Sequence, residues 1–172
     1  YVINVSIQYM GCASSTSRPA RLELTGNDYR NFLLTHNYIY KNTQAYVPKI
    51  YENCGVVVKV YDGDTITVAL KLDSFSSKTY RFQVRLARID CPELRSKKSS
   101  EKIAAHRSRD VVVDMAMEKI VNLTLIGMDK YGRMLCEVFV DGINLSDYLM
   151  ANKYAIPYDG KTKKIPDDWR TI

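Results

Sequence analysis

The strongest constraint on the fold is a series of strand-length segments that starts near residue 54. Each segment either is rich in β-branched residues or alternates between apolar and polar side chains, and turn-forming residues separate them. The Asp62-Gly63 pair is one such turn signal. The segments span residues 56–61, 64–72, 80–89, 122–128 and 134–140.

A helical pattern interrupts this series between the third and fourth segments. Apolar residues recur at helical spacing over residues 103–115, Ser99 or Ser100 can cap the helix, and Glu101 suits its positive end. A second, short helix is predicted after the fifth segment. This order predicts a mainly β, α+β fold, namely a five-stranded Greek-key barrel of the OB type with a helix between strands 3 and 4 and a short C-terminal helix.

The first part of the chain has a different character. Residues 1–49 are polar and show no sustained helical or strand period, so we predict an N-terminal polar segment there and a folded domain over residues 50–172. The domain is long enough to bury a core without disulfide bonds. The 4 cysteines form neither a Cys-x-x-Cys pair nor a Cys/His cluster, which argues against a zinc site or a disulfide framework and favours a reducing compartment.

Three polar segments lie where strands end and turns begin. They are Tyr61-Asp62-Gly63-Asp64-Thr65, Val84-Arg85-Leu86-Ala87-Arg88-Ile89-Asp90-Cys91-Pro92-Glu93 and Asp129-Lys130-Tyr131-Gly132-Arg133. Carboxylates suit a hard divalent cation, and arginines suit a phosphate oxyanion. The chain also carries a net charge of +6, which favours polyanionic partners although many unrelated proteins share it. The pattern indicates metal-assisted hydrolysis of phosphodiesters.

In the order in which they occur, these motifs resemble those of the staphylococcal (micrococcal) nuclease family. The resemblance covers residues 54–159 and rests on Asp-Gly-Asp-Thr, Arg-x-x-x-x-Asp-x-Pro-Glu and Asp-Lys-Tyr-Gly-Arg. It implies an OB-type barrel and calcium-dependent endonuclease activity on DNA and RNA with little sequence preference. The products it implies carry a 5′-hydroxyl and a 3′-phosphate.

The resemblance also implies roles for individual residues. Asp64 and Asp90 would bind Ca²⁺ together with the main-chain carbonyl of Cys91, where the family usually has threonine. Glu93 would position or deprotonate the attacking water. Arg85 and Arg133 would hold the phosphate and stabilise the charge that grows there.

Other residues are weaker candidates for contact with the substrate. Lys130 can touch a phosphate, and Tyr131 and Tyr158 can stack on a base or bind a phosphate, although packing is an equally good role for tyrosines in a chain with 13 of them. Arg95, Lys97, Lys98, Lys102, Arg107 and Arg109 form a basic stretch that can follow a nucleic-acid backbone. Half of this stretch is also what the solvent-facing side of a helix contains.

Two questions stay open at the level of sequence. The alternative to an enzyme is a catalytically weak barrel that binds nucleic acid or protein. The second question is location, because residues 10–15 (Met-Gly-Cys-Ala-Ser-Ser) fit the pattern for N-myristoylation at Gly11, with Cys12 placed for palmitoylation. We expect a monomeric, intracellular, cytoplasmic protein, anchored at the cytosolic face of a membrane if Met10 starts the chain.

Overall fold

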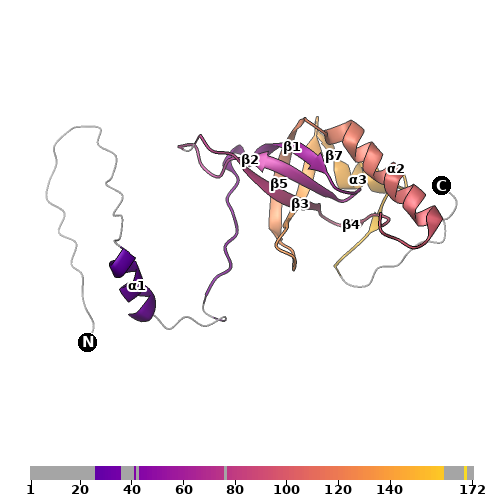
Figure 1. The fold of residues 1–172 in the computed structure, drawn as a ribbon. Helices are drawn as coiled ribbons and strands as arrows, with labels where there is room; N and C mark the ends of the chain where they lie inside the picture. Colours follow the sequence, from indigo (N-terminus) through magenta and orange to yellow (C-terminus); the bar gives the residue numbers. More distant parts are fainter. Residues whose placement is uncertain (1–25, 36–40, 42, 76, 161–168, 170–172) are drawn as a thin grey trace. The chain divides into compact units, whose positions relative to one another are not determined.

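In the computed structural model, the described part of the chain comprises residues 26–35, 41, 43–75, 77–160 and 169 (Figure 1). The chain divides into two units, residues 1–45 and residues 46–172, and each is described by itself. The lipidation candidates Gly11 and Cys12 lie outside the described residues. Within the described part, no helix is long and apolar enough to cross a membrane.

The first unit contains a helix that the sequence analysis missed. Helix α1 spans Gly26–Thr35, in a stretch where no sustained period was recognised. None of its residues is buried, and Tyr29, Phe32 and Leu34 are exposed. A helix without a buried face needs no regular spacing of apolar residues, which explains why the pattern did not predict it.

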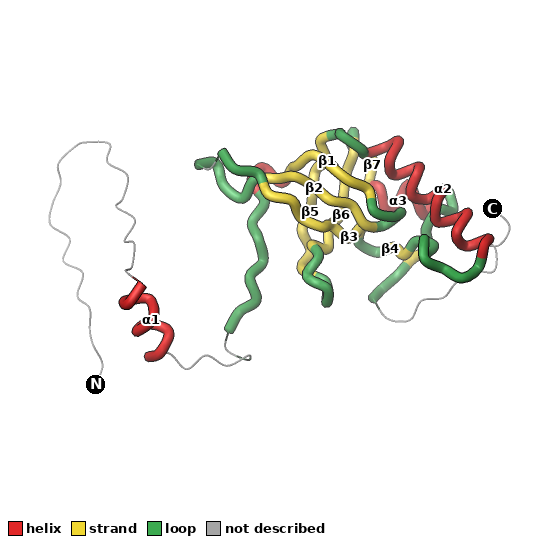
Figure 2. The backbone as a smooth tube through the Cα atoms, in the orientation of Figure 1, coloured by secondary structure: helices red, strands yellow, loops and turns green. Residues whose placement is uncertain are grey.

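The second unit is built around a closed barrel of five strands. The barrel strands are β1 (Cys54–Val60), β2 (Thr65–Leu70), β3 (Tyr80–Leu86), β5 (Ile120–Met128) and β6 (Met134–Val140). They pair in the order β3-β2-β1-β5-β6, and a parallel pairing between β3 and β6 closes the sheet on itself (Figures 1 and 2). Closure leaves no free edge between these two strands. The predicted five-stranded barrel is confirmed.

Helices and short elements complete this unit. Helix α2 (Ser99–Ala116) lies alongside the barrel between the third and fourth barrel strands, and α3 (Leu145–Ala151) follows β6, so both predicted helices are confirmed (Figure 1). The core contains the inward-facing residues of the strands together with Val112 of α2 and Leu149 of α3. The remaining elements are a 3₁₀ turn (Tyr51–Asn53), β4 (Ile89–Asp90), β7 (Ile143–Asn144) and β8 (Ile156–Pro157), and β4 pairs with β8.

Two local predictions need correction. The third strand was expected to continue to residue 89, but β3 ends at Leu86 because Arg88 adopts a left-handed conformation (φ 66°) that breaks the strand before β4 begins. Neither Ser99 nor Ser100 caps α2. The N-cap residue is Lys98, which makes no side-chain cap hydrogen bond. The break at Arg88 and the start of α2 both border the segment that carries Asp90 and Glu93.

Candidate active site

A cleft of about 830 Å³ brings the predicted site residues together. This volume is within the range of small-molecule sites in proteins. Strand ends and turns that lie far apart in the sequence supply its lining. Among the lining residues are Asp64, Arg85, Asp90, Cys91, Glu93, Lys130, Tyr131, Arg133 and Tyr158.

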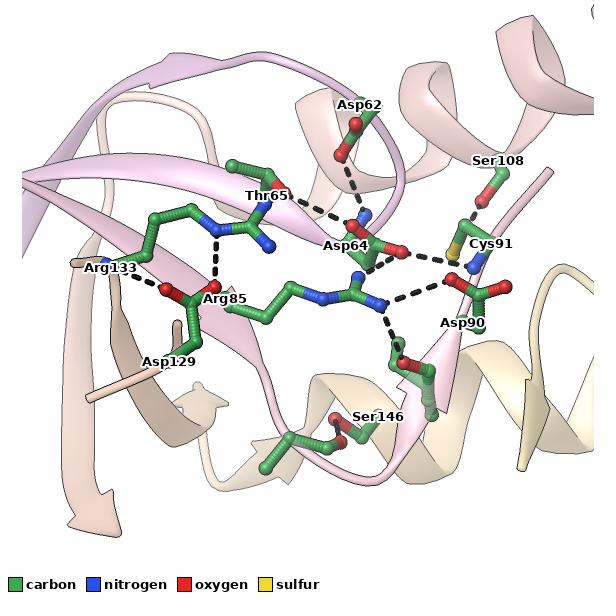
Figure 3. A network of polar contacts seen from close by, with 12 residues as sticks. Asp62, Asp64, Thr65, Arg85, Asp90, Cys91, Ser108, Asp129, Arg133 and Ser146 are labelled. Atoms are coloured by element: carbon green, nitrogen blue, oxygen red, sulfur yellow. Dashed lines mark hydrogen bonds and ion pairs between the residues drawn. The ribbon is translucent and has the colours of Figure 1, made fainter. Parts of the chain in front are cut away.

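Arg85 lies between the two aspartates that were predicted to bind metal. Its Nη1 forms an ion pair with Asp64 Oδ2, and its Nη2 lies 3.1 Å from Asp90 Oδ1 (Figure 3). Nη2 also donates to the carbonyl oxygen of Ile89 at 3.1 Å. All three charged side chains are largely shielded from solvent, with exposed fractions of 9 to 13%. A carboxylate from the turn before β2 and one from β4 therefore meet at one cationic group.

The Asp64 carboxylate is oriented by further hydrogen bonds. Its Oδ1 accepts from Thr65 Oγ1 at 3.0 Å, and its Oδ2 accepts from the Cys91 amide at 3.0 Å. The Asp64 amide in turn donates to Asp62 Oδ1 at 3.2 Å. Burial raises the pKa of Asp62, although a hydrogen bond with Thr65 and the charge of Arg85 oppose this shift. The carboxylates of Asp62 and Asp64 thus both lie at the start of β2.

Cys91 is enclosed rather than reactive. Its thiol is buried and lies 3.3 Å from the Ser108 hydroxyl of α2, which donates a hydrogen bond to it. Burial raises the pKa of the Cys91 thiol to about 12, and the hydrogen bond from Ser108 opposes this only in part. A thiol with this pKa is neutral near pH 7. The Cys91 side chain therefore fills space, and its main-chain amide is the part that contacts Asp64.

A tight turn between β5 and β6 holds Arg133. Asp129 Oδ1 accepts from the amides of Tyr131 and Arg133, both at 2.8 Å, and Asp129 Oδ2 accepts from Arg133 Nε at 2.6 Å. Arg133 Nη1 also donates to Thr65 Oγ1 at 3.1 Å, which ties the turn to β2 (Figure 3). Burial opposes ionisation of Asp129, but the hydrogen bonds from Arg133 and Tyr131 outweigh it and lower the pKa of this carboxyl.

The candidate substrate-contact residues lie at the rim of the cleft. The Tyr131 side chain is 72% exposed, with Lys130 Nζ 5.0 Å and Arg133 Cζ 5.4 Å from its ring centroid. These contacts leave an aromatic ring and two cations side by side, a combination suited to a base and its phosphate. Tyr158 is half-buried, and its amide donates to the Arg88 carbonyl at 2.8 Å.

Glu101 is a residue whose structural role the sequence analysis missed. It was assigned only to the positive end of α2, but its side chain is buried and binds the preceding loop. Glu101 Oε2 accepts from Ser96 Oγ at 2.6 Å, and Oε1 lies 3.4 Å from the Glu93 amide nitrogen, which donates to it. Glu93 itself is exposed at the cleft. The only signal in the sequence is an acidic residue in a first helical turn, which does not reveal burial.

Arg88 is a second residue that the motifs did not single out. Its guanidinium forms a two-pronged contact with Glu137 of β6, at 2.6 and 2.9 Å, and an ion pair with Asp147 of α3 at 2.9 Å. The hydrogen bond from Arg88 lowers the pKa of Glu137, although burial opposes the shift. These contacts fasten the turn that precedes Asp90 to the barrel and to α3.

The donor set fits a hard cation that prefers oxygen ligands. Asp64 and Asp90 already converge on one cationic group, and oxygen atoms are the ligands that Ca²⁺ takes. In the described part of the chain, no cluster of three or more His, Cys, Asp or Glu side chains is close enough to hold a metal ion. The remaining ligands for calcium would therefore come from main-chain carbonyls, water or substrate.

Sequence comparison identifies the family. The sequence profile of the family described as "Staphylococcal nuclease homologue" matches residues 83–168, which is half of the chain. The chain belongs to the staphylococcal nuclease family. The matched region includes Arg85, Asp90, Glu93 and Arg133, whereas Asp64 precedes it. The resemblance inferred from the motifs is confirmed.

Individual relatives agree with this assignment. An "Uncharacterized endonuclease" of Escherichia coli O157:H7 is 33% identical over 106 residues, which are 61% of this chain and 61% of that protein. An "Uncharacterized endonuclease" of Haemophilus influenzae is 36% identical over 90 residues, 52% of this chain and 44% of that protein. A "Probable staphylococcal-like nuclease CAN4" of rice (Oryza sativa subsp. japonica) is 25% identical over 84 residues, 49% of this chain and 16% of that protein. The chain thus spans less than two thirds of the length of these relatives.

Proposed function

We propose that this protein is a calcium-dependent endonuclease that hydrolyses phosphodiester bonds of DNA and RNA with little sequence preference. We propose further that the products carry 5′-hydroxyl and 3′-phosphate ends. The observation that carries the proposal is the shared cleft, in which two arginines, two aspartates and a glutamate meet. Membership of the nuclease family and the printed names of the relatives support the same conclusion.

The two arginines would act on the phosphate. Arg133 is held by Asp129 and Thr65 at one side of the cleft, and Arg85 lies between Asp64 and Asp90. A guanidinium offers two parallel donors to phosphate oxygens, and it stabilises the charge that develops on them during attack. Arg133 is held by residues that are not proposed metal ligands, so it needs little reorganisation when the substrate arrives, whereas Arg85 would exchange its contacts with Asp64 and Asp90 for the phosphate.

Glu93 would act on the attacking water, and the aspartates on the metal ion. Glu93 is exposed at the cleft while its main chain is fastened to Glu101, so its carboxylate can reach a water molecule without loss of the loop geometry. Asp64, Asp90 and the carbonyl of Cys91 would hold Ca²⁺. The ion would polarise a phosphate oxygen and offset its negative charge.

The decisive experiment is digestion of plasmid DNA and of RNA in calcium and in excess chelator. We expect cleavage of both only with calcium, and end-labelling should show free 5′-hydroxyl groups. Glu93→Gln should keep substrate binding and lose turnover. Digestion that continues in chelator would contradict the metal dependence. Binding without any cleavage in calcium would favour the alternative, a barrel that only binds nucleic acid.

We also propose a location for the enzyme. A protein translated from Met10 would expose Gly11 for myristoylation and carry Cys12 for palmitoylation, and two acyl chains suffice for stable attachment at the cytosolic face of a membrane. We expect a monomer bound to the membrane fraction of a eukaryotic cell. Gly11→Ala should release it, whereas Cys12→Ser should only weaken attachment. Mass spectrometry that finds Gly11 unmodified would contradict this.

A further inference from the structure

We propose that Arg95, Lys97, Lys98 and Lys102 form an outer phosphate track, a row of cations that continues the cleft and binds a nucleic-acid strand beyond the bond that is cut. This inference rests on the proposed function, because it assumes a nucleic-acid substrate. The sequence left this basic stretch undecided between a binding surface and an ordinary solvent-facing helix. The four residues differ from Arg107 and Arg109 in position, because they lie in the loop before α2 and in its first turn, whereas Arg107 and Arg109 lie further along the helix.

The outer phosphate track is continuous with the cleft. Arg95 lines the cleft and lies two residues after Glu93, the proposed base. Lys97 and Lys98 continue the same loop, and Lys102 lies in the first turn of α2, which begins at Ser99. All four side chains are exposed. A strand that leaves the cleft past Glu93 therefore meets these cations next.

The cations of the track are not neutralised by ion pairs among the described residues. Among the described residues, no ion pair includes any of the four cations, whereas Arg88, Arg133 and Lys119 each have a carboxylate partner. Glu101, the acid next to Lys102 in the sequence, is buried and receives its hydrogen bonds from the loop itself. The positive charge of the track is thus available to an external anion.

Hydrogen bonds hold the loop of the track in place. Ser96 Oγ donates to Glu101 and accepts from the Lys98 amide at 3.2 Å, and the Ser96 amide donates to the Glu93 carbonyl at 3.0 Å. Cations on an ordered loop lose less conformational entropy when they bind a phosphate than cations on a flexible segment do. This arrangement distinguishes the track from a charged tail that merely improves solubility.

The chemistry of the track indicates what it recognises. Residues 95–102 contain no aromatic side chain on which a base can stack. Lysine ammonium groups bind phosphates as point charges and do not read sequence. The track should therefore strengthen binding of longer strands without creating a sequence preference.

Two triple variants test the proposal. Lys97→Gln with Lys98→Gln and Lys102→Gln removes three charges of the track. The control, Lys49→Gln with Lys59→Gln and Lys153→Gln, removes three exposed lysines that do not line the cleft. Each changes the net charge from +6 to +3, so a general effect of charge is the same in both. Affinity for labelled oligothymidylates of about 4 and about 16 nucleotides, the range of OB-fold sites, is measured by fluorescence anisotropy in excess chelator at several salt concentrations.

The track variant should lose affinity for the long strand and retain it for the short one. For single strands each phosphate contact adds about 0.7 to the slope of log affinity against log salt, so three lost contacts should reduce that slope by about 2. The control variant should behave like the wild type with both strands. Equal losses in the two variants, or a loss with the short strand alone, would overturn the proposal.

Cleavage in calcium and binding to vesicles distinguish the outer phosphate track from the proposed function and from a membrane-binding surface. If the wild type cleaves DNA in calcium but the track variant binds the long strand normally, the track is wrong and the proposed function stands. If length-dependent binding is lost in the track variant but no protein cleaves, the proposed function is wrong and the track stands. If the lysines matter for binding vesicles that contain phosphatidylserine and not for the oligonucleotides, the surface binds membranes and the proposal is refuted.

Discussion

Asp129→Asn offers the sharpest test of how the site is held together. Asp129 Oδ1 accepts the amides of Tyr131 and Arg133, and Asp129 Oδ2 accepts Arg133 Nε. Asparagine retains an oxygen for the two amides, so the turn should still form. Its amide nitrogen, however, would face the Arg133 guanidinium as donor against donor. The substitution therefore releases the guanidinium while it preserves the local backbone.

The structure sets the expected magnitudes. The Arg133 and Asp129 side chains are only 22% and 15% exposed, so their contact counts as a hydrogen bond between charged groups that is partly shielded from water. Such a bond contributes about 1.5–3 kcal/mol, and the free energy of unfolding should fall by this amount. If Arg133 acts like a donor in an oxyanion site, Arg133→Ala should reduce kcat by about 10²–10³. Asp129→Asn keeps the guanidinium and its bond to Thr65, so we expect a loss of about tenfold, or ~1.4 kcal/mol.

The assay combines urea unfolding with steady-state cleavage of a fluorogenic DNA substrate in calcium. Asp141→Asn is the matched control, because it removes the carboxylate of an exposed ion pair. Asp141 Oδ2 lies 3.4 Å from Lys119 Nζ, and the side chains of Asp141 and Lys119 are 75% and 46% exposed. Such a pair contributes at most ~1 kcal/mol, and kcat should not change. Wild-type kcat in Asp129→Asn together with a large loss in Arg133→Ala would show that Asp129 does not position Arg133. Wild-type kcat in both would remove Arg133 from the mechanism.

Three more predictions follow from contacts in the same domain. Because folding lowers the pKa of Asp129, this carboxylate stabilises the protein at pH values above its unfolded-state pKa. When urea unfolding is repeated at falling pH, the difference in stability between wild type and Asp129→Asn should shrink as the pH passes through the folded-state pKa. A difference that stays constant would contradict this. Glu101→Ala should lower kcat more than it raises KM for the fluorogenic DNA substrate, because the Glu93 loop loses its anchor. Glu101→Gln should restore part of the rate, and equal rates in both variants would exclude this positioning role. Gly63→Ala should destabilise the fold by ~1–3 kcal/mol, because the added Cβ would collide with the Ser108 hydroxyl and lie 2.8 Å from Cys91 Sγ. In unfolding experiments on the double variant, Ser108→Ala should relieve part of that loss.

The fold was predictable where burial produces a regular pattern. Ile66, Val68 and Val84 face the core and are fully buried, and their alternation with more exposed neighbours is what indicated strands. The helix α1 has no buried face, so its sequence carries no corresponding pattern. The end of β3 depends on the left-handed conformation of Arg88, a residue whose side chain contacts Glu137 and Asp147 far away in the sequence. Sequence therefore indicated the barrel better than its irregular connections.

The candidate site shows the same division between local and distant contacts. The bond from Arg133 to Asp129 joins residues within one five-residue motif, whereas the bond from Arg133 to Thr65 joins residues 68 positions apart. Glu101 is more instructive, because a surface glutamate in a first helical turn and a buried one that anchors a loop have the same local sequence. What distinguishes them is where the donors lie once the chain has folded. A buried carboxylate requires hydrogen-bond donors, and the loop that carries Glu93 provides them for Glu101. The position of the proposed base at the cleft therefore depends on contacts that form only when the loop packs against α2.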